Sequence, residues 1–407
     1  MINPGSLSNQ VNNAIKTGMS SSVKAGNKNK SLDDRYEYDI YAMRAYCGDG
    51  FYCANYNYMD GKETLSYGKD VHWAYGGALI NNEFPLSSRK LEGDSNNAFY
   101  IYIVRCTESS LKLKDVYKNF DITLYRTHRI KDGKYLYFYF TNLDYEIFND
   151  LYDNDGIIIN RVYYQDVGPL PDKLKELVKK NYKLKKQAPE SEKPLYEMCF
   201  YGLFAMDIQR EIVKKTKEFE ETGKYGILSQ INKLKIQLSL GRATTGLSGY
   251  RKGSMMINGK KEIRDKQEIR PVNCIIATWQ TAFLRYQEWQ LFKQYKDKVI
   301  YMNTDSIYTT EPIDTGEDLG LGHYGVAYDK KLFLGIRRNA YILLNEDGSF
   351  YKSTIGGVMD NYFTPQQIDL LRNGIPIKAR SMTRIHDEKV EAVVTLNPSY
   401  IVHNHKL

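Results

Sequence analysis

The chain has 407 residues, with 57 Lys and Arg against 49 Asp and Glu, which gives a formal net charge of +8. Its hydrophobic fraction of 42% excludes a wholly disordered chain, a collagen and a coiled-coil rod, and its length allows two or three domains or one multi-lobed enzyme. The basic balance is compatible with a polyanionic partner such as nucleic acid. The 35 tyrosines allow two interpretations: stacking faces for bases, or the codon bias of an AT-rich genome.

The five cysteines are scattered and form neither a CxxC pair nor a Cys/His cluster with zinc spacing. Such a pattern fits a reducing compartment. The first residues carry no charged segment followed by an apolar stretch, and no apolar run approaches the roughly 20 residues of a membrane helix. We therefore expect a cytoplasmic protein, in the host cytoplasm if it is viral, with no membrane partner.

Residues 1–33 are rich in Ser, Asn, Gly and Lys and predict a flexible basic arm. Residues 36–81 are strand-like, with aromatic residues interrupted by glycines. Clear strands are predicted at 99–104 and 135–140. The Asp-Gly pair at 132–133 predicts a hairpin turn directly before the second of them.

Helical patterns begin in the middle of the chain. Residues 171–186, which start with Pro-Asp, predict a basic helix, and further helical stretches follow at 195–221 and 227–240. Residues 241–272 are full of Gly, Lys and Arg and indicate a loop or a hairpin insertion. A long helix is predicted at 273–295.

A strand at 299–308 follows, interrupted by a polar tip centred on Asp305. The tail, 335–407, alternates short strands with polar turns. These elements predict an α+β fold in which helices are inserted between antiparallel strands. Asp305 would lie at the turn of a hairpin, where a carboxylate can project towards a ligand, although an aspartate in a turn is commonly only a turn former.

Asp70 is a second candidate carboxylate, at the end of a strand and before a helix-compatible turn. Taken alone, a helix N-cap is the simpler interpretation of this aspartate. Two strand-end carboxylates that are distant in sequence can, however, meet in space and bind two divalent cations, which stabilise the entering and leaving oxygens of a phosphoryl displacement. Because Mg²⁺ needs only one or two carboxylates beside phosphate oxygens, Asp70 and Asp305 would be enough.

Five segments resemble, in chain order, the motifs of family B DNA polymerases, in particular the protein-primed branch of small phages and linear plasmids. DVHWAYG at 70–76 resembles D-x-x-S-L-Y-P, KLKIQLSLG at 233–241 resembles K-x-x-x-N-S-x-Y-G, and YMNTDS at 301–306 resembles Y-x-D-T-D-S. RAYCGDGF at 44–51 resembles the template-contacting Y-x-G-G segment, and RRNAYILL at 337–344 resembles the K-x-Y segment near the primer end. The resemblance covers roughly residues 40 to 360.

The resemblance implies a right-hand polymerase with an antiparallel palm sheet, helical fingers and a small β-rich thumb. The regions it implies are a basic arm at 1–35, the first palm segment at 36–80, an insertion like the priming-protein region at 81–168, fingers at 169–245, a loop or hairpin insertion at 246–272, the second palm segment at 273–345 and a thumb-like region at 346–407.

The resemblance also implies a role for each motif residue. Asp70 and Asp305 would be catalytic and would bind two Mg²⁺ ions, which Mn²⁺ could replace, with the carbonyl of Val71 assisting. Tyr75 would pack beneath the sugar of the nucleotide and exclude a 2′-hydroxyl. The other implied nucleotide-binding residues are Lys233, Lys179, Lys183 and Gly241, with Lys185 as an alternative helical lysine. The implied DNA-binding residues are Tyr46, Gly48, Thr304, Arg338 and Tyr341.

Several positions depart from the family pattern. Asn303 replaces the first aspartate of the Y-x-D-T-D-S motif, and Asn339 stands where the primer-end segment has lysine. Gln237, Leu238 and Leu240 replace the Asn, Ser and Tyr of the fingers motif. Since only about 40 residues precede the palm, we also expect no proofreading exonuclease.

The leading interpretation is a template-directed DNA polymerase, protein-primed and without proofreading. Its expected partners are a DNA template and primer, deoxynucleoside triphosphates and a priming protein. The altered fingers motif leaves open a related palm nucleotidyltransferase with ribonucleotide, primase-like or untemplated activity. Asn303 leaves open a non-catalytic nucleic-acid-binding protein.

Overall fold

The computed structural model describes about 60% of the chain. The described residues are 50–85, 99–122, 124–125, 130–164, 167–188, 254–257, 260–263, 274–337, 339–355, 362–373, 375–385, 388–394 and 402–404, with positions 45, 218 and 221–223. The predicted basic arm lies outside these residues, and the helical stretches predicted at 195–221 and 227–240 lie almost entirely outside them.

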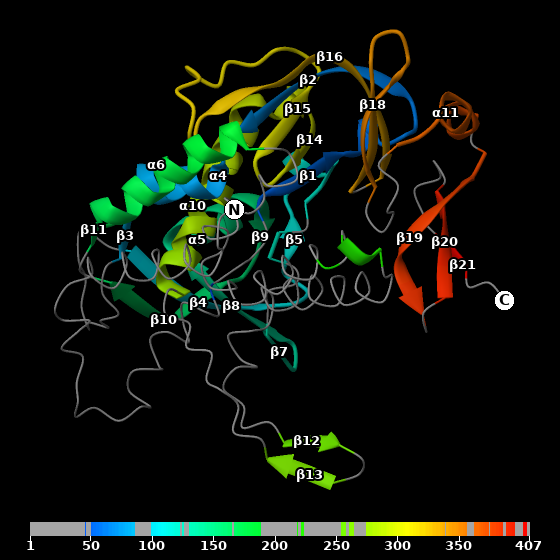
Figure 1. Ribbon diagram of the computed structural model, residues 1–407. Helices are drawn as coiled ribbons and strands as arrows, with labels where there is room; N and C mark the ends of the chain where they lie inside the picture. Colours follow the sequence, from blue (N-terminus) through cyan, green and yellow to red (C-terminus); the bar gives the residue numbers. More distant parts are fainter. Residues whose placement is uncertain are drawn as a thin grey trace.

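A large antiparallel sheet of eight strands dominates the upper part of the molecule (Figure 1). Its strand order is β18-β17-β16-β2-β15-β14-β1-β6. Strands from the first third of the chain, β1, β2 and β6, therefore pair with strands that follow α10 in the sequence. The strands are β1 (Tyr52–Asn55), β2 (Glu63–Val71), β6 (Phe120–Asp121), β14 (Val299–Asn303), β15 (Ser306–Thr309), β16 (Tyr324–Arg337), β17 (Ala340–Leu344) and β18 (Phe350–Ile355). The prediction of antiparallel pairing is confirmed.

One face of this sheet is lined by aromatic rings. We call it the tyrosine face and define it by Tyr52, Tyr301, Tyr308, Tyr328 and Tyr341, which are all between 0 and 9% exposed. The rings contact one another in edge-on, tilted or stacked arrangements, with centroids 5.0–5.8 Å apart. Many of the tyrosines that the composition offered for base stacking therefore form a core in this part of the chain.

The opposite face is covered by α10 (Cys274–Tyr295), the long helix that the sequence predicted. Trp289 and Phe292 of this helix are fully buried and pack against Phe51 at ring-centroid distances of 5.6 and 5.4 Å. Because successive strand residues point to opposite faces, Met302 and Ile307 join this apolar layer while their neighbours belong to the tyrosine face. α10 therefore packs on the face of the sheet opposite the tyrosine face.

A second sheet packs on the other side of α10 through α5 (Asn142–Leu151). Its order is β10-β4-β8-β7, with strands β4 (Phe99–Thr107), β7 (Ile130–Asp132), β8 (Tyr135–Thr141) and β10 (Ile157–Tyr164). The strands predicted at 99–104 and 135–140 are confirmed. The predicted Asp-Gly turn is also confirmed, since Asp132 pairs with Tyr135 and Gly133 has a φ of 57°.

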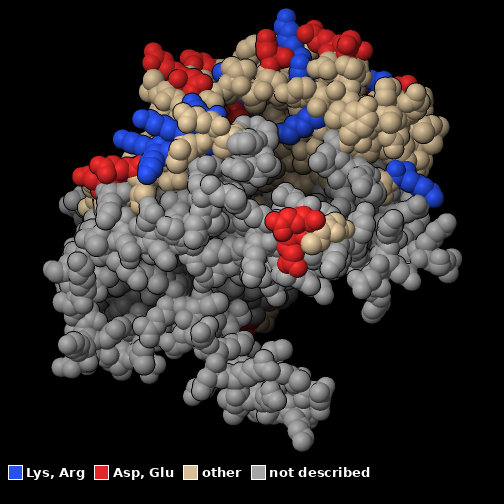
Figure 2. Space-filling view, viewed as in Figure 1, with Lys and Arg blue, Asp and Glu red and all other residues tan. Residues whose placement is uncertain are grey.

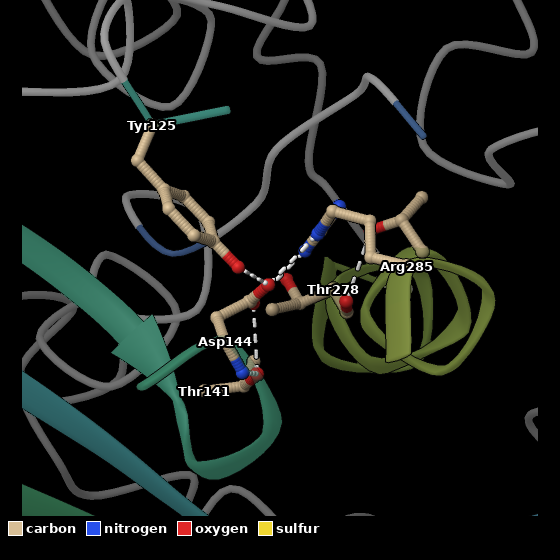
Figure 3. A network of polar contacts seen from close by, with 6 residues as sticks. Tyr125, Thr141, Asp144, Thr278 and Arg285 are labelled. Atoms are coloured by element: carbon tan, nitrogen blue, oxygen red, sulfur yellow. Dashed lines mark hydrogen bonds and ion pairs between the residues drawn. The ribbon is translucent and has the colours of Figure 1, made fainter. Parts of the chain in front are cut away.

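A buried charge pair joins α5 to α10 (Figure 3). The Arg285 guanidinium donates to both oxygens of Asp144, at 2.8 and 2.9 Å, and both side chains are at most 1% exposed. The hydroxyls of Tyr125 and Thr141 donate to the same carboxylate, each at 2.8 Å. Four charged or hydroxyl partners thus satisfy one another where water is excluded.

Two further helices lie beside the large sheet. α4 (Ala74–Asn81) follows β2 directly, so the strand-like pattern predicted up to residue 81 is wrong in its last turns: the run Ala-Tyr-Gly-Gly-Ala-Leu-Ile is buried as a helix between α6 and α10. α6 (Asp172–Gln187) confirms the predicted basic helix.

The remaining elements are short or lie at the C-terminal end. α11 (Pro365–Arg372), which the sequence analysis did not predict, begins with a capping box between Thr364 and Gln367. The others are β3 (Glu83–Pro85), β5 (Lys112–Leu113), β9 (Tyr152–Asp153), β11 (Val167–Pro169), the hairpin β12 (Ser254–Ile257) and β13 (Lys260–Ile263), and the sheet of β19 (Ile377–Ile385), β20 (Glu388–Val394) and β21 (Val402–Asn404). Among the helices of the described chain, none combines the length and apolar composition needed to cross a membrane.

Candidate active site

The hairpin of β14 and β15 carries the first candidate carboxylate at its tip. Thr304 has a left-handed φ of 61°, its N–H donates to the Phe51 carbonyl at 2.9 Å, and the N–H of Asp305 donates to the Asn303 carbonyl at 2.7 Å. Gly50 lies directly against this turn, where a Cβ would come within 2.5 Å of the Thr304 Cα. Glycine is therefore required at position 50 for the close approach.

The tertiary structure brings Asp70 and Asp305 together. β2 pairs with β15 in a register that places Asp70 opposite Ser306, and the N–H of Val71 donates to the carbonyl of Asp305 at 2.8 Å. Both aspartates are half-buried. Residues that are 235 positions apart in the sequence thus become backbone neighbours at the end of three adjacent strands.

The alternative that Asp70 caps the following helix is wrong. The N-cap of α4 is Trp73, which has a left-handed φ of 51° and makes no side-chain capping bond. The backbone between Asp70 and the helix is held by a loop instead, because the His72 N–H donates to the His323 carbonyl at 2.9 Å and the Gly322 N–H donates to the His72 carbonyl at 2.7 Å. The carboxylate is therefore not used to cap the helix.

The pairing register also assigns a face to these residues. Asp70 is opposite Ser306, Ser306 is opposite Asn303, and Asn303 is opposite Tyr52. Residues that are directly opposite in an antiparallel sheet point to the same side. Asp70 therefore stands on the tyrosine face, away from α10.

A third carboxylate, Glu288 of α10, lies behind the pair and is 1% exposed. Its Oε1 accepts a short hydrogen bond from the Tyr324 hydroxyl, and its Oε2 has no hydrogen-bond partner. Burial raises the pKa of Glu288 well above its usual value, and the negative charges of Asp305 and Asp70 raise it further, against the lowering effect of the Tyr324 hydrogen bond. Burial raises the pKa of Tyr324, and the charge of Glu288 and the hydrogen bond to it raise that pKa further, as do the charges of Asp305 and Asp70.

The donor set fits a divalent cation that also binds phosphate. Among the described residues no three His, Cys, Asp or Glu side chains form a group able to hold a metal ion by themselves. Mg²⁺ in phosphoryl-transfer sites uses one or two carboxylates and completes its shell with substrate oxygens and water. Asp70 and Asp305 are the two carboxylates that would bind such an ion here. Asn303 supplies an amide oxygen nearby, which accepts a hydrogen bond from the Thr304 hydroxyl at 3.2 Å.

The candidate nucleotide-binding residues are only partly described. Tyr75 lies on α4, is 5% exposed, and its carbonyl accepts a hydrogen bond from the Gln280 amide of α10 at 2.8 Å. Of the helical lysines, Lys179 and Lys183 are exposed one turn apart on α6, whereas Lys185 is half-buried with its Nζ 6.0 Å from the Trp73 ring. Lys233 and Gly241 lie outside the described residues.

An aromatic stack links the basic helix to the Asp70 segment. The Trp73 ring lies 5.9 Å from that of Tyr182 with the planes 19° apart, and Tyr182 is on α6. This contact gives a structural reason for the tryptophan that departs from the family pattern in DVHWAYG. Figure 2 shows the blue side chains gathered over α6 at the left of the molecule, so the helix presents its lysines outward while Trp73 anchors it.

The candidate DNA-binding residues fall into three groups. Thr304 lies in the tip of the β14–β15 hairpin, next to Asp305. Tyr341 is 4% exposed, and its hydroxyl bonds Tyr308 at 2.9 Å and accepts from Thr354 at 3.1 Å, so it is a member of the core of the tyrosine face. Tyr46, Gly48 and Arg338 lie outside the described residues.

Three features of the site were missed in the sequence. Gly50 lies two positions after the glycine that was singled out at 48, in the same segment, and only its contact with Thr304 distinguishes it. Arg285 and Glu288 are charged residues in a predicted helix rich in aromatic and aliphatic residues, and that was the available signal. A charge in a buried stretch indicates a paired or functional group.

The comparisons with known proteins support the fold. The chain is similar to phi29 DNA polymerase complexed with primer-template DNA and incoming nucleotide substrates, with a TM-score of 0.53 and 14% identity over 95% of this chain and 67% of that one. It is also similar to phi29 DNA polymerase complexed with primer-template DNA in the post-translocation binary complex, with a TM-score of 0.53 and 14% identity over 89% of this chain and 63% of that one. No protein-family model and no curated protein matches the sequence. The chain thus has a polymerase-like fold and spans about two thirds of the length of these polymerase chains.

Proposed function

We propose that this protein is a template-directed DNA polymerase that uses two metal ions for nucleotidyl transfer. The observation that supports the proposal most is the convergence of Asp70 and Asp305 at the ends of paired strands of an antiparallel sheet. The fold similarity to a DNA polymerase supports the same class of reaction. DNA template, primer and deoxynucleoside triphosphates are the proposed partners, and a priming protein is the proposed source of the first hydroxyl.

The proposed domains follow from this function. The eight-stranded sheet would be the palm, and α6 with the segment after it would belong to the fingers. The four-stranded sheet β10-β4-β8-β7, together with α5, would be an insertion of the priming-protein type. The β12–β13 hairpin would be the second insertion. Since β18 pairs with β17, the palm would extend beyond the boundary at residue 345, and the thumb would begin after it.

In the proposed reaction, the 3′-hydroxyl oxygen of the primer attacks the α-phosphorus of the nucleotide. A new P–O bond forms, the bond to pyrophosphate breaks, and the hydroxyl proton passes to water. Two bound Mg²⁺ ions would activate the hydroxyl and neutralise charge on the leaving oxygens. Asp70 and Asp305 would hold those ions, and exposed lysines such as Lys179 and Lys183 would neutralise the triphosphate.

Substitution of either aspartate tests the proposal. We expect Asp305→Asn and Asp70→Asn to reduce templated deoxynucleotide incorporation by about 10³-fold or more, because each loses charge stabilisation of several kcal/mol in the transition state. Primer extension on a defined template with Mg²⁺ or Mn²⁺, with deoxy- and ribonucleotides offered separately, measures this. Asp347→Asn, which changes an exposed aspartate in the β17–β18 turn, is the matched control and should retain activity.

The outcomes separate the alternatives. Ribonucleotide addition, or addition without a template, in the wild type would favour a related palm nucleotidyltransferase. Wild-type DNA binding without any nucleotide incorporation would favour a non-catalytic nucleic-acid-binding protein. Full activity in either aspartate variant would contradict the metal-site assignment.

A further inference from the structure

A pocket of about 430 Å³ lies between α10 and the irregular segment that follows β15. This volume is within the range of about 300–1,000 Å³ that is typical of small-molecule sites. We call it the amide pocket, because three glutamines of α10 line it. Its polar lining residues are Gln287, Gln290, Gln294, Asp314, Thr315 and His323.

The helical wall of the amide pocket presents side-chain amides. Gln287, Gln290 and Gln294 are separated by three and four positions, so they share one face of α10, and none of the three is buried. The Gln294 amide donates to the Tyr295 hydroxyl at 3.0 Å, and that hydroxyl donates to the Asp314 carbonyl at 2.6 Å. This chain of hydrogen bonds connects the helical wall to the irregular wall.

The irregular wall combines glycines with an unsatisfied hydroxyl. Gly316 and Gly322 both line the pocket, with left-handed φ values of 80° and 83°, and their lack of side chains lets a flat ligand approach the backbone closely. The hydroxyl of Thr315 is buried and has no hydrogen-bond partner within the described part of the chain. Because a buried hydroxyl is costly without a partner, this wall favours a ligand that supplies one.

The amide pocket lies on the side of the large sheet that α10 covers. Tyr324, which lines the pocket, is opposite Val71 in the pairing of β16 with β2, and both side chains pack in the apolar layer with α10. Asp70 precedes Val71, and successive strand residues point to opposite faces. The pocket is therefore separate from the proposed metal site.

The charges around the amide pocket disfavour an anionic ligand. No Lys or Arg is among the described residues that line it, whereas Asp314 lines it and Glu317 is exposed on the same segment. A phosphate here would meet negative charge without a cationic partner. A glutamine amide donates and accepts at once, and in nucleic-acid recognition it binds the edge of adenine through both groups. A neutral base with donors and acceptors on one edge matches this lining.

We propose that the amide pocket binds an uncharged purine nucleoside of the adenosine type. Gln287 and Gln290 would bind the edge of the base, and the Asp314 carboxylate would accept from a sugar hydroxyl, as acidic residues do in dinucleotide sites. The Thr315 hydroxyl would gain the partner that it lacks in the described chain. The site goes beyond the proposed function, because it needs neither metal ions nor the aspartate pair.

Titration of adenosine into the whole chain tests the site. Isothermal titration calorimetry in EDTA, which removes divalent cations, should show saturable binding at one site per chain and no tighter binding of AMP. Gln287→Leu/Gln290→Leu should weaken adenosine binding about tenfold or more, and Thr315→Val about threefold, because each loses hydrogen bonds to the ligand. Gln366→Leu, which changes an exposed glutamine on α11, is the matched control and should bind like the wild type.

The melting temperature of each variant without ligand shows whether it is folded, and Thr315→Val keeps the test decisive if the double glutamine variant is not. Absence of saturable adenosine binding up to millimolar concentration would overturn the proposal, as would unchanged affinity in the folded pocket variants. Tighter binding of AMP than of adenosine would also overturn it, because that result requires a cationic group. Asp305→Asn should leave the adenosine affinity unchanged, and a loss there would place the nucleoside at the proposed metal site instead. Since no incorporation is measured, the result is independent of the polymerase activity.

Discussion

Glu288 is a carboxyl group for which the proposed chemistry provides no direct contact. It is buried behind the aspartate pair, one oxygen accepts from Tyr324, and the other has no hydrogen-bond partner. Burial raises its pKa, and the charges of Asp305 and Asp70 raise it further. A group of this kind favours the neutral form in the folded protein, which spares the site a third adjacent negative charge.

The raised pKa of Glu288 makes stability depend on pH in a defined direction. Below the ordinary glutamate pKa of about 4.3, folded and unfolded states both carry the proton and the full contribution to stability is present. As the pH rises, the unfolded state releases its proton first, so stability falls until the folded pKa is passed. Because the side chain of the Glu288→Gln variant cannot ionise, its free energy of unfolding should not show this decrease with rising pH. Urea unfolding at a series of pH values from 4 to 8 measures the free energy of unfolding of both proteins. If the two free energies change in parallel with pH, the raised pKa of Glu288 is contradicted.

At the scale of elements, α10 joins the two sheets through polar contacts on one side and aromatic packing on the other. Besides the pair of Arg285 with Asp144, the Tyr286 hydroxyl donates to Glu146 at 2.9 Å and the Lys293 ammonium lies 3.2 Å from Asp150, so three side chains of α10 meet α5. The contacts made by Tyr286 and Lys293 are exposed and contribute little to the stability of the fold. The buried pair is therefore the contact between α5 and α10 that matters most for how the two sheets are held together.

Removing one partner of that buried pair should be costly. We expect Asp144→Ala to destabilise the fold by about 3–5 kcal/mol, because the Arg285 guanidinium would stay buried without its counter-charge. The double variant Asp144→Leu/Arg285→Met should recover much of the loss, since two apolar side chains can replace a buried pair. Urea unfolding measures both, with Lys293→Met as the control for the exposed contact. If Asp144→Ala and Lys293→Met lower the free energy of unfolding by similar amounts, the buried pair does not have the special role given to it here.

At the scale of the whole molecule, the charge distribution matters for binding a polyanion. The exposed lysines of α6 stand on the helix whose Tyr182 stacks on Trp73, close in sequence to Asp70. Figure 2 shows these lysines as a blue group with acidic side chains beside it, and Asp172 and Glu176 of the same helix are also exposed. A polyanion would be drawn to the helix by counterion release as well as by direct contacts.

The salt dependence of DNA binding tests this distribution. Affinity should fall steeply with ionic strength, and Lys179→Ala/Lys183→Ala should make the slope of log affinity against log salt shallower by about one to two, because each lysine lost releases one fewer counterion. The matched control, Lys112→Ala/Lys118→Ala, changes two exposed lysines away from α6. Identical slopes for the two double variants would remove α6 from the binding surface.

Local patterns predicted several of the described elements. The Asp-Gly turn at 132–133, the strand 135–140, the long helix ending at Tyr295 and the hairpin around Asp305 depend on interactions between residues close in sequence. The helix at 74–81 was missed as a whole element because its composition, Ala-Tyr-Gly-Gly, has no strong helical signal, and its burial against α10 and α6 overrides that weak propensity. The roles of the individual site residues remain predictions.

What the sequence by itself determined is the antiparallel α+β class, the positions of the strong strands and helices, and Asp70 and Asp305 as strand-end carboxylates. Only the tertiary structure decided that these two aspartates are neighbours, that Glu288 lies buried behind them, that Gly50 must be a glycine, and that Tyr341 belongs to a core. The physical reason is that each of these facts depends on contacts between residues far apart in the chain. Periodicity and turn chemistry act over a few residues, whereas strand order and burial are properties of the packed molecule.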